Sequence, residues 1–216
     1  MKNEQMPSRL NWKEAFSFPL QSPASRRDVF VGGLLLLFLG PVGWILNMGH
    51  RLNVVQRLAN SQTPYFQGFA PWPHTFKRGA VAALAIALYL SPCLLSSALG
   101  FFCYRSGLSP SLAPALWALG LLCFLWGIFT LPGCMTVYAV EGDSSILRHP
   151  ARAFLHAWAH RRMYVRAWLI GGSSIALSFL GLLGLGFGFL FTSVWAWSVV
   201  GYVFTVAMYA PISARA

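Results

Sequence analysis

Three histidines in the second half of the chain have a spacing that could serve a metal ion. His149, His156 and His160 are seven and four residues apart, which places all three on one face of a continuous helix. An i, i+4 histidine pair can hold zinc, and histidine also ligates haem. No cysteine or carboxylate is adjacent, and Arg148 and Arg152 would repel a cation. We therefore interpret the histidines as polar surface residues and predict no metal and no cofactor.

Two carboxylates form the second candidate for chemistry. Glu141 and Asp143, in the segment Glu141-Gly142-Asp143-Ser144-Ser145, are the only acidic residues after position 28. A paired-carboxylate site needs another acidic group or a bound substrate to act on. We favour a turn into the next helix, with Ser144 or Ser145 as its cap, so no catalytic residue is predicted.

The amino-acid composition indicates whether these groups belong to a soluble protein or to a membrane protein. Of the 216 residues, 56% are hydrophobic and only 10% are charged, whereas soluble domains carry about a quarter charged residues. A water-soluble protein of this size could not cover so much apolar surface. The sequence therefore predicts an all-α integral membrane protein with one polytopic domain over residues 29–210.

Apolar runs long enough to cross a bilayer set the expected topology. About 20 apolar residues span the hydrocarbon core. The uncharged run 167–210 would be about 66 Å long as one helix, which corresponds to about two crossings. Gly181, Gly184 and Gly188 mark a turn within it or close helix contacts. The predicted spans are 79–103, 112–135, 166–184 and 189–210.

The first apolar run, residues 29–48, is interrupted in its middle. It contains Gly40 and Pro41, followed by Gly43, and proline breaks or kinks a helix. Basic residues lie on both sides of the run, and a single crossing would place one basic cluster outside the cell. We therefore prefer a re-entrant hairpin plus four spanning helices over five full crossings.

The basic residues agree with one orientation of this topology. The chain has 16 Lys and Arg against 5 Asp and Glu, a net charge of +11. The preferred topology leaves every basic residue except Arg105 in the cytoplasm, together with both termini. No nucleic-acid recognition module is recognisable, so we assign the charge to anionic lipid headgroups. The predicted headgroup and interface residues are Arg51, Arg57, Trp72, Lys77, Arg78, Arg148, Arg152, Trp158, Arg161 and Arg162.

Segments outside the spans are expected to lie at the cytoplasmic membrane surface. Residues 150–163 have an apolar face that includes Trp158 and an opposite basic face, as helices in the headgroup plane do. The segment 50–58 is also amphipathic. Residues 1–28 form a predicted interfacial arm, and 211–216 form a short tail.

Three short motifs distinguish the region 30–80: Gly32-Gly33-Leu34-Leu35-Leu36-Leu37, Gly40-Pro41-Val42-Gly43-Trp44 and Gly49-His50-Arg51-Leu52. Together they resemble the opening of a known family of prokaryotic membrane proteins, the domain-of-unknown-function 4013 family. Pro71-Trp72 and Gly79 also match the loop and the glycine that follow the family's opening, although the carboxylates usual around that Trp are missing here. The resemblance implies a multi-helix fold in a prokaryotic cytoplasmic membrane and no activity.

Three functions are compatible with these observations. Ionisable residues are absent from the interiors of the predicted spans, whereas ion-coupled transporters place them there. We favour a non-enzymatic accessory or structural subunit, or a scaffold, that contacts lipids and other membrane proteins or further copies of itself. A transporter or channel for an apolar or zwitterionic substrate is the alternative, motivated by Pro41, Pro92 and Pro132. An enzyme acting on lipid headgroups through the acids and histidines is the weaker one.

Overall fold

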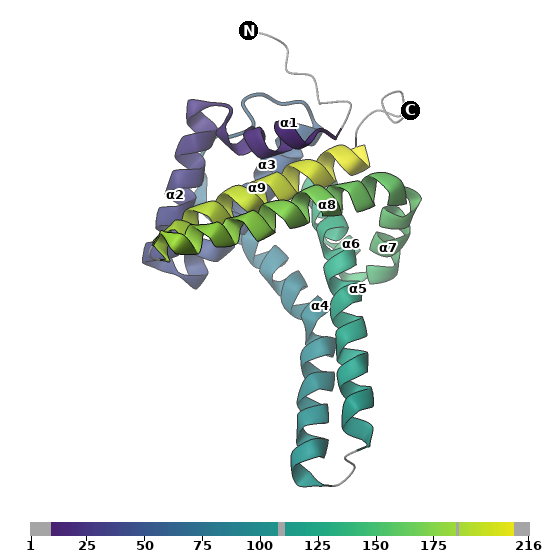
Figure 1. Cartoon of the computed structure of the whole chain (residues 1–216). Coiled ribbons are helices and arrows are strands. Elements are labelled where there is room, and N and C mark those ends of the chain that lie inside the picture. The colour runs from purple at the N-terminus through teal and green to yellow at the C-terminus, as the bar shows by residue number, and fades with distance from the viewer. Residues whose placement is uncertain (1–9, 108–110, 185, 210–216) are drawn as a thin grey trace.

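The computed structural model describes residues 10–107, 111–184 and 186–209, and within them the chain forms helices and no β-strand. Figure 1 shows two regions. The hairpin, which we define as residues 84–106 of α4 and 112–128 of α5, extends away from the rest of the described chain, which we call the body. The elements are α1 (Trp12–Ser17), η1 (Phe18–Leu20), α2 (Pro23–Leu39), α3 (Pro41–Ala59), α4 (Trp72–Ser106), α5 (Leu112–Glu141), α6 (Ser145–Arg148), α7 (Pro150–Ala159), α8 (Arg161–Ser178), η2 (Phe179–Leu183) and α9 (Phe187–Tyr209).

Four of these segments are long and apolar enough to cross a membrane: α4, α5, α8 with η2, and α9. This confirms an all-α chain with four helices of membrane-spanning character. The helices α4 and α5 are longer than the predicted spans and contain Pro92 and Pro132 inside them. The structure therefore begins α4 at Trp72, seven residues before the start of the predicted span at residue 79.

The chain reverses direction at Gly40, between α2 and α3. Gly40 has φ +50°, a conformation that disfavours side chains with a Cβ, and Pro41 takes the first position of α3, where its missing N–H costs nothing. At its other end α2 begins with a capping box between Ser22 and Ser25. The turn that the re-entrant prediction needs is present, and re-entry into a membrane stays a prediction.

The segment 50–58 belongs to the core of the body. Leu52, Val55 and Leu58 on α3 are 1–3% exposed and pack against other helices. The predicted amphipathic pattern is real, but its apolar face is covered by protein.

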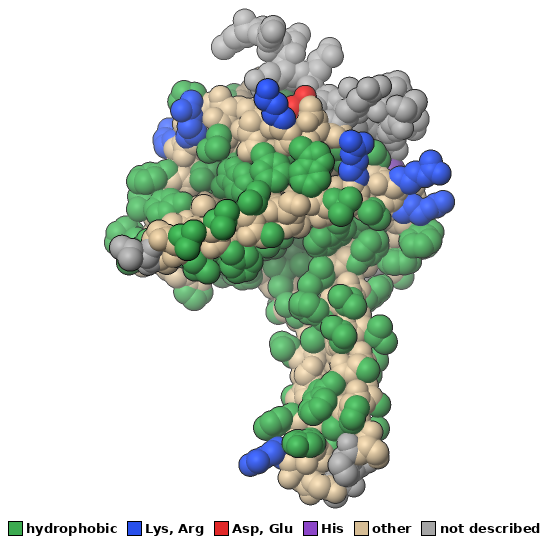
Figure 2. Space-filling view, viewed as in Figure 1, with side chains coloured by type: hydrophobic (Ala, Val, Ile, Leu, Met, Phe, Trp, Pro, Cys, Tyr) green, Lys and Arg blue, Asp and Glu red, His purple; other side chains and the backbone are tan. Residues whose placement is uncertain are grey.

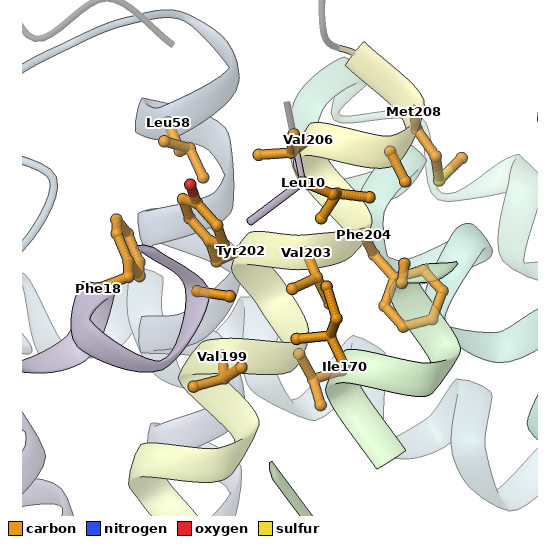
Figure 3. Close-up of a cluster of buried hydrophobic side chains, with 14 of the residues drawn as sticks. Leu10, Phe18, Leu58, Ile170, Val199, Tyr202, Val203, Phe204, Val206 and Met208 are labelled. Atoms are coloured by element: carbon orange, nitrogen blue, oxygen red, sulfur yellow. The ribbon is translucent and has the colours of Figure 1, made fainter. Parts of the chain in front are cut away.

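The N-terminal segment and α9 form the centre of the body (Figure 3). Phe18 packs against Tyr202 in a tilted arrangement, with ring centroids 4.6 Å apart, and the Trp195 indole N–H donates to the Phe16 carbonyl at 3.1 Å. Leu10 and Phe18 are 2% and 3% exposed. One side of the described part of the predicted surface arm is thus a component of the core, whereas Trp12 and Leu20 are 45% and 48% exposed.

The helix α8 contacts α5 next to Pro132, the proline inside α5. Pro132 has no N–H and disturbs the local hydrogen-bond ladder. The Tyr164 hydroxyl of α8 inserts there, accepting from the Gly133 N–H at 3.1 Å and donating to the Phe129 carbonyl at 2.6 Å. Tyr164 is fully buried, so this contact also fixes how α8 and α9 cross the base of the hairpin (Figure 1).

The turn between α8 and α9 contains the predicted glycines. The backbones of Gly181 and Gly188 approach so closely that a Cβ on either would overlap the other residue's backbone. Gly184 ends η2, and Gly186 has φ +82°. Small residues thus let the two helix ends meet.

Candidate functional site

The body contains a polar cluster at the crossing of α3 and α4. Gly49 and Gly79 bring the two helix backbones into direct contact, since a Cβ on either residue would overlap backbone atoms of the other helix. This close approach places the polar residues of α3 beside the first turns of α4.

Arg78 is the centre of the part of this cluster between α3, α4 and α5. Its Nη1 donates to Asn53 Oδ1 at 2.8 Å and to Gln56 Oε1 at 2.6 Å, and its Nη2 donates to the Ala139 carbonyl at 2.8 Å. Asn53 in turn donates to Thr75 Oγ1 at 3.1 Å. Arg78 is 8% exposed. Neutral oxygen atoms therefore solvate the charge of Arg78, and the side chain connects three helices.

A second group of contacts ties the loop after α3 to α2. The Gly68 N–H donates to Asp28 Oδ2 at 2.8 Å, and His50 Nδ1 lies 3.1 Å from the Gly68 carbonyl. His50 Nε2 lies 3.5 Å from Asp28 Oδ2, and Arg27 lies 3.4 Å from Oδ1. Asp28 and His50 are 2% and 5% exposed. The loop is thus held by backbone and side-chain contacts at one buried point.

Burial dominates the titration of His50. Removal of the ring from water lowers the pKa of His50 below its ordinary value. The Asp28 carboxylate and the Gly68 carbonyl raise that pKa, and Arg57 lowers it further, but desolvation is the largest effect. The ring is therefore neutral near pH 7, with Nδ1–H donating to Gly68.

Sequence reasoning missed most of these partners. It assigned Arg78 to lipid headgroups and gave no role to Asp28, His50, Asn53 or Gln56. A signal was present, because His50, Asn53 and Gln56 recur every third residue on α3, a spacing that gathers side chains on one helix face. An isolated acid at the start of an apolar run is a second such signal.

The three predicted histidines are not arranged on one continuous helix. His149 precedes α7 and His160 follows it, so both lie outside the helical residues. His149 Nδ1 lies 2.9 Å from the Ser145 carbonyl, and the side chain of His156 is outside the described part. Among the described residues no group of three His, Cys, Asp or Glu side chains could hold a metal ion.

The predicted turn after α5 is present, with a different cap. Gly142 ends α5 with φ +73°, and Asp143 accepts from the Ser145 N–H at 2.8 Å and from its hydroxyl at 2.6 Å. Asp143, and neither serine side chain, therefore caps α6. These two hydrogen bonds lower the pKa of Asp143. Glu141 accepts from the Tyr209 hydroxyl at 3.1 Å.

The remaining basic residues divide between surface and interior. Lys77, Arg148, Arg152, Arg161 and Arg162 are exposed, whereas Arg51 and Arg57 are partly buried. Figure 2 shows basic side chains on the body and at the far end of the hairpin, where α4 ends just after Arg105.

The two predicted interface tryptophans are both about half exposed. Trp72 begins α4 and stacks on Phe69. Arg161 lies over the ring of Trp158, 5.8 Å from its centroid. The helix predicted over 150–163 ends at Ala159, because the chain bends at His160 before α8.

The hairpin presents apolar side chains outward along its length (Figure 2). Arg105 is the only charged residue between positions 84 and 128, and that segment has no histidine. Small residues form the seam: Gly100 faces Trp117, and Gly120 faces Ser96 and Ser97. The outward side chains, each at least 50% exposed, include Leu84, Leu88, Leu94, Leu95, Leu99, Phe101, Phe102, Leu121, Leu122 and Leu125.

A cavity of about 130 Å³ lies in the body beside the base of the hairpin. It is bounded chiefly by α3, α5 and α9, with single contributions from α2 and α4, and most of its lining is apolar. Of the predicted site residues, Arg51 lines it. This cavity combines apolar walls with one charged side chain, that of Arg51.

The chain matches no protein-family model, no curated protein and no solved structure in the three comparisons made. The resemblance to the domain-of-unknown-function 4013 family therefore stays a prediction.

Proposed function

We propose that the chain is a non-enzymatic accessory or structural subunit, or a scaffold, of a larger assembly in a prokaryotic cytoplasmic membrane. The observation that carries the proposal is the hairpin, whose two helices contact each other and leave their other faces apolar and uncovered. Side chains of this kind are stable in lipid or against other apolar helices.

The dimensions of the hairpin support contact with a partner. At about 1.5 Å per residue, α4 and α5 are about 52 and 45 Å long, compared with about 30 Å of hydrocarbon. Away from its base, the hairpin consists of α4 and α5 packed on each other (Figure 1), whereas α9 packs on α2, α3, α5 and α8. Exposed aromatic rings such as Phe101, Phe102 and Trp126 add large contact area for a further helix.

The chemistry-bearing groups also favour a non-enzymatic role. Arg78, Asp28 and His50 hold helices and a loop together, and the acids after α5 cap a turn or bind Tyr209. These groups are engaged in contacts that position the backbone. By the positive-inside rule, the exposed arginines of the body support a cytoplasmic location for the surface that carries them.

Site-specific photo-cross-linking in the native membrane tests this proposal. A photoreactive phenylalanine analogue is placed on α5 at Leu121 or Leu125, and on α4 at Leu95 or Leu99, all more than half exposed. We expect one protein adduct, the same from both positions of one face, that co-purifies in mild detergent in fixed stoichiometry. Leu169 on α8, which is 61% exposed, is the matched control position in the body. A stable lone monomer that gives only lipid adducts from both faces contradicts the proposal.

A transporter or channel for an apolar or zwitterionic substrate is the second candidate, and the cavity favours it. Helices α3, α5 and α9 enclose space in the body, and Pro132 lies in its wall. Reconstituted liposomes that show no flux above empty vesicles, across panels of lipids, ions and neutral solutes, would exclude this function.

A further inference from the structure

The guanidinium of Arg51 enters the cavity without an oxygen partner. No hydrogen bond from it, and no carboxylate within 4.0 Å of it, occurs among the described residues. Its nearest ring contact is Trp197, whose centroid lies 5.2 Å from Cζ. A partly buried arginine without an anion carries a desolvation cost that a bound oxyanion would offset.

A glycine on α9 fixes the position of the Arg51 side chain. A Cβ at Gly201 would lie 3.2 Å from Arg51 Cγ and 3.5 Å from its Cδ. The aliphatic part of the Arg51 side chain therefore packs against α9 at Gly201, where no side chain is in its way. Trp197 and Gly201 are four residues apart on that helix, so they line the same face of the cavity.

Four polar side chains of the wall have already used their donors. The hydroxyls of Thr136, Ser193 and Ser198 each donate to a carbonyl of their own helix. The Asn47 amide donates to two backbone carbonyls. Among the described lining residues, Arg51 is the one that carries a full positive charge, and its N–H groups have no protein acceptor. A ligand here is recognised by an anionic oxygen group.

The shape and lining of the cavity select an amphiphile. Its volume corresponds to about four water molecules, and buried residues such as Leu52, Met135 and Phe204 form its inner wall. Trp44 and Trp197, 40% and 45% exposed, line its open side. A free inorganic anion would leave these apolar walls against water, whereas an acyl chain would cover them.

We propose that the cavity binds one anionic membrane lipid, with a phosphate oxygen of its headgroup on Arg51 and the start of an acyl chain between Trp44 and Trp197. The site is distinct from general attraction to headgroups, because one arginine and one cavity define it. It does not depend on whether the chain is an accessory subunit.

Native mass spectrometry of the full chain, freed of lipid in maltoside detergent, tests the proposal. The probes are dioleoyl phosphatidylglycerol, dioleoyl phosphatidylcholine and inorganic phosphate. We expect one tightly bound phosphatidylglycerol per chain, a dissociation constant at least about tenfold weaker for phosphatidylcholine, and no displacement by millimolar phosphate.

Two variants and a control locate the binding. Arg51→Gln removes the charge, Ser198→Leu fills the cavity without changing charge, and Arg26→Gln makes the same charge change at an exposed residue outside the cavity. We expect at least about tenfold weaker binding for the first two and wild-type binding for the third.

Several results would overturn the lipid site. They are wild-type binding by Ser198→Leu, an equal loss in Arg26→Gln, equal affinity for phosphatidylcholine, or displacement by phosphate, which would indicate a free anion. Thermal unfolding of each variant separates lost binding from misfolding. Should Arg51→Gln fail to fold, Ser198→Leu and the lipid comparison decide.

Discussion

The body and the hairpin differ in where their side chains find contact partners. In the body, the buried charges of Arg78 and Asp28 have partners from the same chain: Arg78 contacts three neutral oxygens, and Asp28 accepts from Gly68. In the hairpin, residues such as Leu94 and Leu122 are 66% and 64% exposed, so no described part of the chain covers them. The body therefore depends on internal geometry, and the hairpin depends on its surroundings.

The glycines show the same difference. At the α3–α4 crossing in the body, Gly49 and Gly79 face backbone atoms, which cannot move without moving a helix. In the hairpin seam, Gly120 faces the hydroxyl groups of Ser96 and Ser97, which can rotate. Substitutions of the same kind should therefore have unequal effects in the two regions.

The largest effect is expected from Arg78→Met. The change leaves the oxygens of Asn53, Gln56 and Ala139 without their donor. We expect a loss of about 4 kcal/mol, at about 1–3 kcal/mol for each unsatisfied buried group. Thermal unfolding in detergent measures it. Lys77→Met, at the neighbouring exposed position, should unfold as the wild type does; equal losses in both variants would show that the cluster is unimportant.

Gly49→Ala should have the next largest effect. The new Cβ overlaps the Thr75 carbonyl, so α3 and α4 must separate. Overpacking of this kind costs about 2 kcal/mol or more. Gly172→Ala on α8 is the matched control, because a Cβ there meets nothing within 4 Å. A wild-type unfolding midpoint for Gly49→Ala would mean that the helices do not cross this closely.

Hydrophobic run lengths predicted the four apolar helices, because a bilayer requires long uncharged segments and few other structures satisfy their backbone there. The Gly40-Pro41 turn was also readable from local chemistry. The contacts of the polar cluster were not, because Asp28 meets Gly68, and Arg78 meets Ala139, only through tertiary packing. Basic residues near apolar runs suggest headgroups by default, which hid the buried role of Arg78 and the cavity position of Arg51.

A smaller effect is expected from acidification. Since burial lowers the pKa of His50, the unfolded chain binds the extra proton first as pH falls below about 6.5. Stability should therefore decrease between pH 7.5 and 5.5, by an amount on the order of 1 kcal/mol.

Unfolding midpoints at a series of pH values test this, with His50→Gln expected to remove the dependence. His74→Gln, at an exposed position, should retain it. The charged groups near His50 are Asp28, Arg57 and Arg27. A rise in stability on acidification would contradict the prediction and show that the imidazolium bond to Asp28 outweighs burial.

The smallest effect is expected for Gly120→Ala in the hairpin seam. Its Cβ would lie 2.8 Å from the Ser96 hydroxyl and 2.9 Å from that of Ser97, both side-chain atoms, and 3.3 Å from the Cys93 carbonyl oxygen. We expect a change below about 1 kcal/mol, because the two closest obstacles are side-chain atoms that can rotate and alanine favours helix. The comparison with Gly49→Ala is direct, since both add one methyl group at a helix contact. Equal losses in the two variants would mean that the hairpin seam is as rigid as the body, and that its stability does not need the lipid or partner helices that surround it.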